Sequence, residues 1–147
     1  MISNYKYSKK VKGSSTYKRL ELFLPVRPVP ASRPRISRYG SYYTKTYTDF
    51  RREAYSYLKQ VPNKFNDTSG RFKITLEIIS YRPKKPSKSY PRGDNDNYEK
   101  SYYDSITYAG IAWDDDVQIV ENITTKRYQE EGEDYGARII IEQLKGI

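Results

Sequence analysis

The stretch Phe72-Lys-Ile-Thr-Leu-Glu-Ile-Ile-Ser80 carries the clearest structural pattern in the sequence. Its polar residues alternate with apolar ones that recur at every second position, at Phe72, Ile74, Leu76 and Ile78. Successive side chains of a β-strand point to opposite faces of the sheet, so this period predicts a strand over about 71–81 with one buried face.

Three further segments have strand patterns. Leucines alternate with other residues over 20–24 until Pro25 ends the run, and a similar alternation occupies 137–142 near the C-terminus. A strand is also expected over about 117–127. The first of these strands lies well before the 71–81 stretch and the other two follow it.

Two helices are expected between the strands. Over about 48–60 the apolar residues recur at helical intervals, at Phe50, Ala54, Tyr57 and Leu58. Over about 97–109 a second stripe consists of Tyr98, Tyr102 and Ile106, with Asp96 as the expected N-cap and Glu99 at the third position of a capping box.

The resulting order β-α-β-α-β-β predicts one α+β domain over residues 18–147, with a mixed sheet and two main helices. Residues 1–17 are polar and rich in Lys and Ser, so a flexible basic arm is expected there. The segment Pro25–Pro34 contains four prolines, which exclude a helix interior or a central strand and predict an extended loop. Residues 82–93 are expected to form a second loop, rich in Pro, Lys and Arg.

The charge of the chain is divided unevenly. The 147 residues carry a net charge of +9, but residues 1–92 hold 22 Lys or Arg and 5 acids, whereas 93–147 hold 5 basic residues and 13 acids. A strongly basic region favours a polyanionic partner such as nucleic acid, because Lys and Arg that neutralise phosphates release condensed counterions. A merely soluble basic surface is the alternative.

The chain has neither Cys nor His. The absence of these two residue types excludes disulfides, thiolate nucleophiles, zinc sites built on Cys or His, and any triad with an imidazole base. Catalysis would have to depend on carboxylates, Lys, Arg, Tyr, Ser or Thr, or on a metal ion with oxygen ligands such as Mg²⁺. No stretch is apolar enough for a membrane span or a signal peptide, so a soluble intracellular protein is expected.

The acidic residues gather in two clusters that flank the second expected helix. Asp94 and Asp96 stand one residue apart at its start, and Lys100 and Asp104 follow Asp96 at successive four-residue steps on one helix face. The second cluster is Asp114-Asp-Asp116. Each cluster alone could be a helix cap or a solvated turn, but acids within a basic, phosphate-binding chain favour a site for a hard cation.

Tyrosines are interleaved with the basic residues after the proline-rich segment. Aromatic rings beside cations can stack on unpaired bases, although packing in the core is an equally good interpretation of each tyrosine alone. The tyrosines are Tyr39, Tyr42, Tyr43 and Tyr47, and their basic neighbours are Arg33, Arg35, Arg38 and Lys45.

These motifs resemble the RusA family of Holliday junction resolvases, which are common in phages and prophages. The resemblance covers about residues 20–143, and its specific part is Asp94-x-Asp96-Asn97-x-x-Lys100-x-x-x-Asp104, then Gly110, Asp115-Asp116-x-Gln118 and Lys126. The combination is more selective than either half. This chain has three consecutive Asp where two would suffice.

The resemblance implies a small, homodimeric, Mg²⁺-dependent endonuclease that binds four-way DNA junctions and nicks opposing strands symmetrically. Mn²⁺ is expected to substitute for Mg²⁺, and no small-molecule cofactor is expected. The metal ligands would be Asp94, Asp96 and Asp116, with Asp115 as the alternative to Asp116, and Lys100 would be the essential lysine.

Supporting or phosphate-contacting roles are expected for Asp104, Gln118 and Lys126. From the basic segments we expect DNA contacts at Arg27, Arg33, Arg35, Arg38, Lys84, Lys85, Lys88 and Arg92.

The implied setting is recombination and repair in the cytoplasm of a bacterial host, with a phage or prophage as the source of the gene. Two alternatives remain at this point. One is a junction-binding protein with weak or no catalysis, and the other is a single-strand or RNA-binding phage protein in which the acids are solvated turns.

Overall fold

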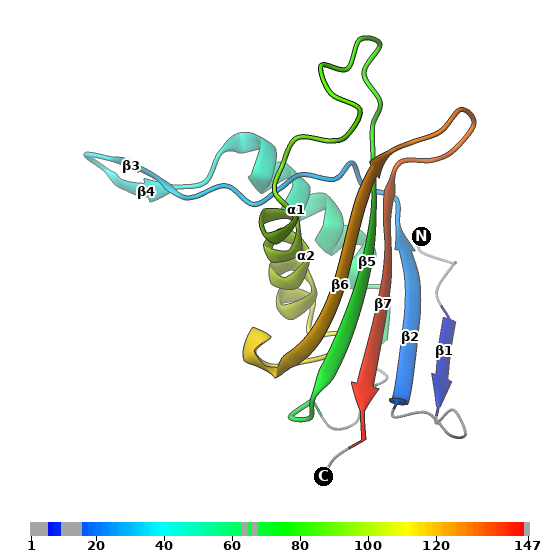
Figure 1. Cartoon of the computed structure of the whole chain (residues 1–147). Helices are drawn as coiled ribbons and strands as arrows, with labels where there is room; N and C mark the ends of the chain where they lie inside the picture. The colour runs from blue at the N-terminus through cyan, green and yellow to red at the C-terminus, as the bar shows by residue number, and fades with distance from the viewer. Residues whose placement is uncertain (1–5, 10–15, 63–64, 66–67, 146–147) are drawn as a thin grey trace.

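A computed structural model describes residues 6–9, 16–62, 65 and 68–145, with side chains described from residue 18 onward. Two helices cover one face of a five-stranded sheet, and a small two-stranded hairpin projects from the body (Figure 1). The sheet consists, in spatial order, of β1 (Lys6–Lys9), β2 (Thr16–Leu24), β7 (Gly136–Leu144), β5 (Phe72–Ser80) and β6 (Ile119–Tyr128). The remaining elements are β3 (Arg35–Ser37), β4 (Gly40–Tyr42), α1 (Lys45–Leu58), α2 (Asn95–Ala109) and the short 3₁₀ helix η1 (Asp116–Gln118).

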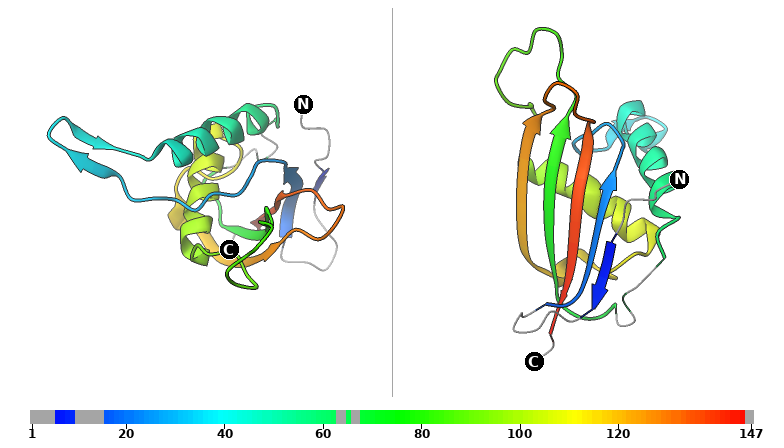
Figure 2. Two further views of the ribbon diagram at one scale, coloured as in Figure 1. Left: turned by 90° about the horizontal axis from the view of Figure 1, so that it is seen from above. Right: turned by 90° about the vertical axis from the view of Figure 1, so that its right-hand side faces the viewer.

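The sheet is mixed, because β5 pairs parallel with β6 and antiparallel with β7. Strand β2 is also antiparallel to β7, so β2, β5 and β6 all run in one direction. Helix α1 lies on the connection from β2 to β5, and α2 lies on the connection from β5 to β6. Both crossovers use the same side of the sheet, which leaves its other face uncovered by helices (Figure 2).

The core lies between the helices and the covered face of the sheet. The alternating apolar residues of β2, β5 and β7 are buried, and those of the helices pack against them. The aromatic rings of Phe50 and Tyr102 meet edge to face at 5.4 Å, as do those of Phe72 and Trp113 at 5.7 Å. Neither helix in the described ranges is long and apolar enough to cross a membrane.

The predicted α+β class and the order β-α-β-α-β-β are confirmed, but the N-terminal part of the prediction needs a correction. Residues Lys6–Lys9 form β1, which pairs antiparallel with β2, and β2 already begins at Thr16. The expected flexible arm over 1–17 is therefore wrong for these residues, and its remaining positions lie outside the described part of the chain. Strand β1 and the part of β2 before Leu20 lack the apolar alternation that identified the other strands.

Helix α1 begins three residues before its predicted start. Thr44 is its N-cap and accepts a hydrogen bond from the backbone N–H of Tyr47 at 3.3 Å. The apolar periodicity did not reveal this start, because the first turn carries no apolar residue before Tyr47. The segment 25–34 lacks regular secondary structure, as its prolines predict, and the hairpin β3–β4 follows it directly.

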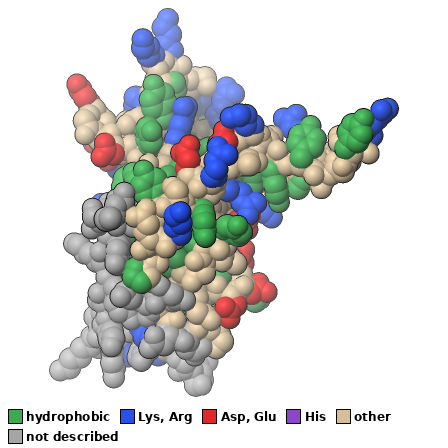
Figure 3. Space-filling model, turned by 180° about the vertical axis from the view of Figure 1, so that it is seen from behind, with side chains coloured by type: hydrophobic (Ala, Val, Ile, Leu, Met, Phe, Trp, Pro, Cys, Tyr) green, Lys and Arg blue, Asp and Glu red, His purple; other side chains and the backbone are tan. Residues whose placement is uncertain are grey.

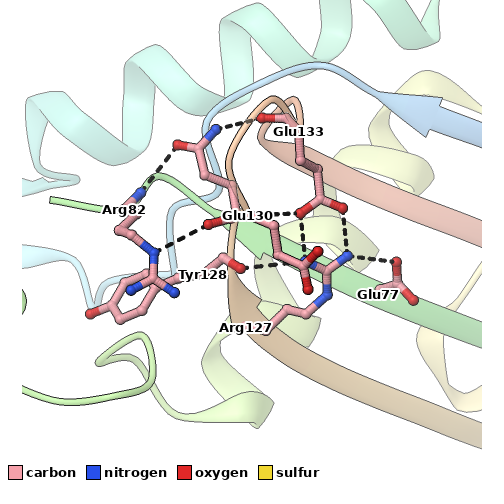
Figure 4. A network of polar contacts seen from close by, with 7 residues as sticks. Glu77, Arg82, Arg127, Tyr128, Glu130 and Glu133 are labelled. Atoms are coloured by element: carbon pink, nitrogen blue, oxygen red, sulfur yellow. Dashed lines mark hydrogen bonds and ion pairs between the residues drawn. The ribbon is translucent and has the colours of Figure 1, made fainter.

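A polar network fixes the turn between β6 and β7 (Figure 4). The two terminal nitrogens of Arg127 donate to the two carboxylate oxygens of Glu133 at 2.5 and 2.7 Å. Gln129 donates to the backbone oxygen of Glu133 at 2.8 Å and accepts from the backbone N–H of Arg82 at 3.1 Å. The network therefore ties this turn to the start of the basic loop over residues 81–93.

The network predicts an acid-dependent loss of stability. The hydrogen bonds from Arg127, together with one from the backbone of Glu130, lower the pKa of Glu133 from its usual 4.5 to about 2. A carboxylate with a lowered pKa in the folded state contributes stability above its unfolded pKa, and this contribution is lost as the pH falls through the folded value. Wild type should therefore exceed Glu133→Gln in unfolding free energy above pH 4.5, and the difference should vanish toward pH 2, as measured by urea unfolding across this range.

Glu131→Gln serves as the matched control for this prediction, because Glu131 lies in the same turn and makes no ion pair within the described residues. Its unfolding free energy should follow that of wild type at every pH. A pH-independent difference between wild type and Glu133→Gln would contradict the prediction.

Candidate active site

The first acidic cluster lies at the N-terminal end of α2. Asp94 is the N-cap residue, with extended backbone angles of −71° and 147°, but its carboxylate makes no capping hydrogen bond. Asp96 lies in the first turn and accepts from the backbone N–H of Asn97 at 3.0 Å. Both side chains are exposed. Two carboxylates at this end of the helix are therefore accessible to a ligand.

The predicted capping box at this end is wrong. The helix begins at Asn95, one residue before the expected cap Asp96, and Asp94 takes the N-cap position. The carboxylate of Glu99 instead accepts from the side chain of Asn122 at 2.6 Å and from the hydroxyl of Tyr103 at 3.3 Å. Burial raises the pKa of Tyr103 to about 12, so its hydroxyl remains a donor. The Glu99 carboxylate thus joins α2 to β6.

The backbone before Asp94 is held in place by a contact with β6. Its conformation also requires a glycine at position 93, because a side chain there would be strained. Lys126 donates from its ammonium to the carbonyl oxygen of Gly93 at 2.5 Å. Gly93 has a φ of +31°, and a Cβ there would lie 2.6 Å from the ring of Tyr98. Lys126, for which a supporting role was predicted, therefore contacts the residue next to Asp94.

The second acidic cluster lies at the other end of α2, where Gln118 organises its backbone. The side-chain oxygen of Gln118 accepts from the N–H groups of Asp114 and Asp115, both at 2.9 Å. Its amide nitrogen donates to the carbonyl oxygens of Thr68 and Gly70 at 2.6 and 2.8 Å. One side chain therefore holds the turn with the three aspartates against the loop before β5.

Asp115 and Asp116 differ in what their carboxylates contact. Asp115 caps η1 by accepting from the backbone N–H of Val117 at 3.1 Å. One oxygen of Asp116 accepts from the indole nitrogen of Trp113 at 3.1 Å and from the hydroxyl of Thr107 at 3.3 Å. Trp113 is buried, so it gives the Asp116 carboxylate a fixed direction. Sequence reasoning missed this role, although the chain's single Trp stands directly before the three aspartates.

A surface cavity of about 350 Å³ lies beside this second cluster. It brings together Asp104 and the three aspartates, and the hydroxyl of Tyr47 in α1 donates to Asp104 at 3.1 Å. Burial and the neighbouring Asp104 carboxylate raise the pKa of Tyr47, so the tyrosine stays protonated and acts as the donor. Arg51 of α1, for which no role was predicted from the sequence, also lines this acidic cavity.

The structure thus separates the predicted site residues into two groups. Asp104, Asp115, Asp116 and Gln118 lie at the C-terminal end of α2, whereas Asp94 and Asp96 lie at its N-terminal end. Asp96 and Thr107, the contact of Asp116, are eleven residues apart, which corresponds to about 16 Å along a helix. Lys100 lies between the ends, is exposed and forms no ion pair with a described residue.

The distance between these two groups of carboxylates determines whether those of a single chain could ligate one metal ion together. Among the residues that the structure describes, no three acidic side chains lie close enough together to ligate one ion. The donor atoms themselves are the carboxylate oxygens that Mg²⁺ prefers. The chemistry of the predicted ligands therefore suits Mg²⁺, but a single chain does not assemble the set Asp94, Asp96 and Asp116.

The predicted DNA-contact residues are exposed, and all but Arg27 and Arg33, which lie in the segment 25–34, belong to two projections. Arg35 and Arg38 belong to the β3–β4 hairpin, whereas the loop 81–93 extends beyond the upper end of the sheet (Figure 1). Basic side chains gather along the upper edge of the molecule and reach the tip of the hairpin (Figure 3). The exposed set is Arg27, Arg33, Arg35, Arg38, Lys84, Lys85, Lys88 and Arg92.

The chain thus combines exposed carboxylates at both ends of α2 with two basic projections that suit a polyanionic partner such as nucleic acid. A sequence model of the family described as Endodeoxyribonuclease RusA matches residues 25–142. The chain therefore belongs to the RusA family, whose members are nucleases that hydrolyse phosphodiester bonds of junction DNA. No curated protein matches the chain.

The contacts of Gln118 predict a marked loss of stability in Gln118→Ala. This substitution removes a partner from two backbone N–H groups and two carbonyl oxygens at once, so the unfolding free energy should fall by about 1–3 kcal/mol. Val117→Ala is the control, because Val117 is the next residue and is 79% exposed. Equal urea midpoints for the two variants would show that Gln118 does not hold the turn.

Proposed function

We propose that this chain is a Mg²⁺-dependent endonuclease that binds four-way DNA junctions as a homodimer and introduces paired symmetric nicks. Membership of the RusA family supports the nuclease activity and the junction substrate. The observation that carries the metal dependence is the exposed carboxylate of Asp94, which makes no capping bond at the end of α2 where the basic loop 81–93 arrives.

The two-ended distribution of the aspartates is the reason for proposing a dimer. If two α2 helices lie antiparallel across a two-fold axis, the N-terminal end of one meets the C-terminal end of the other. Asp94 and Asp96 of one chain would then face Asp116 of the second chain. Lys100, which lies midway along α2, would be close to the axis and hence to both sites. Each dimer would contain two identical metal sites, one for each nick.

The residues of this chain have distinct roles in that site. Bound Mg²⁺ supplies the charge that lowers the pKa of a coordinated water and neutralises the attacked phosphate. Asp94 and Asp96 provide ligands on one side, and Trp113 and Thr107 direct the carboxylate of Asp116 from the other. Lys100 stabilises the negative charge that develops on the phosphate or on the leaving oxygen. Asp115 is the weaker ligand candidate because its carboxylate caps η1.

DNA binding is assigned to the hairpin and to the loop 81–93. From residue 22 to residue 48 the chain has no acidic residue, and the loop 82–92 has none either. Phosphates of two neighbouring arms would lie along these projections and lead into the site at the end of α2. We assign the activity to DNA recombination and repair in a bacterial cell, with a phage or prophage as the source of the gene.

Catalysis should require both ends of α2. Asp96→Asn and Asp116→Asn should each reduce junction cleavage in Mg²⁺ by at least about 100-fold, with junction affinity within a few-fold of wild type, because each removes one charged ligand from an exposed position. A gel assay on a labelled four-way junction measures cleavage, with EDTA as the metal-free control. Asp134→Asn, an exposed aspartate in the β6–β7 turn, is the matched variant and should cleave normally; normal cleavage by the first two would contradict the site.

A heterodimer experiment separates a shared site from a site within one chain. Asp96→Asn and Asp116→Asn chains carrying different tags are coexpressed, and the heterodimer is isolated with both tags. If each site combines the two chains, one site of the heterodimer is intact and the other lacks both ligands, so single-strand nicking should return without paired nicks. If each site lies within one chain, both sites are defective and the heterodimer should remain as inactive as its parents.

A second candidate function follows from the incomplete metal site of the single chain. A junction-binding protein that lacks catalysis would bind four-way DNA in EDTA and in Mg²⁺ alike and would never nick it. The assay above distinguishes the two, because only the nuclease nicks the junction when Mg²⁺ is added.

A further inference from the structure

A second cavity, of about 380 Å³, lies between α1 and α2 beside the acidic cavity. The two cavities have Arg51 and Tyr108 in common, so they adjoin at these side chains. The further walls include Tyr43 and Tyr55, together with Arg52. Its volume lies within the range of about 300–1,000 Å³ that is usual for small-ligand sites. None of these residues has a role in the proposed metal site.

The aromatic side chains of this cavity are unusually exposed. Tyr108 is 69% exposed, Tyr43 39% and Tyr55 38%. The rings of Tyr55 and Tyr108 meet at 5.1 Å with an angle of 66° between their planes, so each keeps one face free of the other. Aromatic faces presented to solvent beside cations are the means by which proteins stack unpaired bases.

The two arginines of the cavity differ in their partners. Arg52 forms an ion pair with Asp49 at 2.8 Å, whereas Arg51 has no ion pair with any described residue. The guanidinium of Arg51 instead lies 5.7 Å from the ring centroid of Tyr43 and 5.8 Å from that of Tyr47. These rings hold Arg51 at the boundary between the two cavities. Its guanidinium therefore remains available for a phosphate.

We propose that this tyrosine-lined cavity receives one nucleotide that is unstacked from the branch point of the junction. The base would lie against Tyr55 and Tyr108, and the guanidinium of Arg51 would bind the phosphate that leads toward the acidic cavity. The inference rests on the proposed function, because its ligand is junction DNA. It adds a way in which the protein would distinguish the branch point from a continuous duplex. A fully paired duplex offers no free base to this site.

A chemical double-mutant cycle tests the contact between base and tyrosine. Wild type and Tyr108→Ala are titrated in EDTA against a fluorescent four-way junction and against junctions with one abasic residue at each nucleotide that flanks the branch. Tyr108→Ala should weaken binding of the intact junction by about 5-fold or more. At one abasic position the difference between the two proteins should disappear, because the base that Tyr108 would contact is already missing.

Tyr135→Ala is the matched control, because Tyr135 is 37% exposed and lies outside the cavity. Any effect it has on affinity should be the same for intact and abasic junctions. Tyr55→Ala should reproduce the result for Tyr108→Ala, and thermal unfolding verifies that each variant is folded. The proposal is overturned if the loss in Tyr108→Ala is equal for every junction. It is also overturned if Tyr108→Ala lowers the oligomeric state in sedimentation, since the cavity would then be a contact between chains.

The proposed function fails in a different way from this inference. If wild type binds the junction no more tightly than a duplex of the same sequence, the junction specificity is wrong whatever Tyr108 does. If wild type prefers the junction and no abasic position is coupled to Tyr108, the junction specificity stands and only the nucleotide site is rejected.

Discussion

The parallel pairing of β5 with β6 is the constraint on which the rest of the structure depends. Parallel neighbours cannot be joined by a tight turn, so the chain that leaves the end of β5 has to return along the whole sheet before β6 begins. Helix α2 makes this return. Whatever precedes the helix is therefore at one end of the sheet, and whatever follows it is at the other. The two acidic clusters are close in sequence and distant in space for this reason alone.

The same constraint explains how the charge is distributed over the molecule. The connection out of β5 is the basic loop 81–93, and it delivers the chain directly to Asp94 at the exposed end of α2. Cations and carboxylates thus meet at one end of the molecule, where repulsion among the acids would be offset by the neighbouring basic side chains. At the opposite end the aspartates are stabilised differently, by hydrogen bonds from Trp113, Thr107 and the backbone.

Much of this fold could be predicted from local patterns in the sequence. The two-residue period of β5 and the stripe of Tyr98, Tyr102 and Ile106 identified the sheet and the second helix within a few residues. The pattern of charge also indicated the two acidic clusters, and the resemblance to the RusA family selected Asp94, Asp96 and Asp116 among their residues. What these patterns do not encode is distance across the fold, so the separation of Asp94 from Asp116 could not be predicted from the motif.

The roles of Trp113 and Arg51 depend on tertiary contacts in the same way. Trp113 directs a carboxylate three residues later because the chain turns there, and Arg51 reaches the acidic cavity because α1 packs beside α2. The charged edge strand β1 was missed for a different reason, since its residues have no apolar alternation. A strand that depends on pairing with β2 leaves little trace in its own sequence.

The basic loop 81–93 is anchored at both of its ends. Its first end contacts the turn that follows β6, and its second end contacts β6 itself. Arg82 is bound by Gln129 at one end, and Gly93 is bound by Lys126 at the other. Between these two anchors most of the loop is exposed, apart from Pro91, which is buried next to the second anchor, so the exposed part can change in length and sequence without altering the core. The loop is in this respect an exchangeable module. Relatives could diverge here in the branched DNA they prefer while keeping the same chemistry, and a designer could graft a new loop between the anchors.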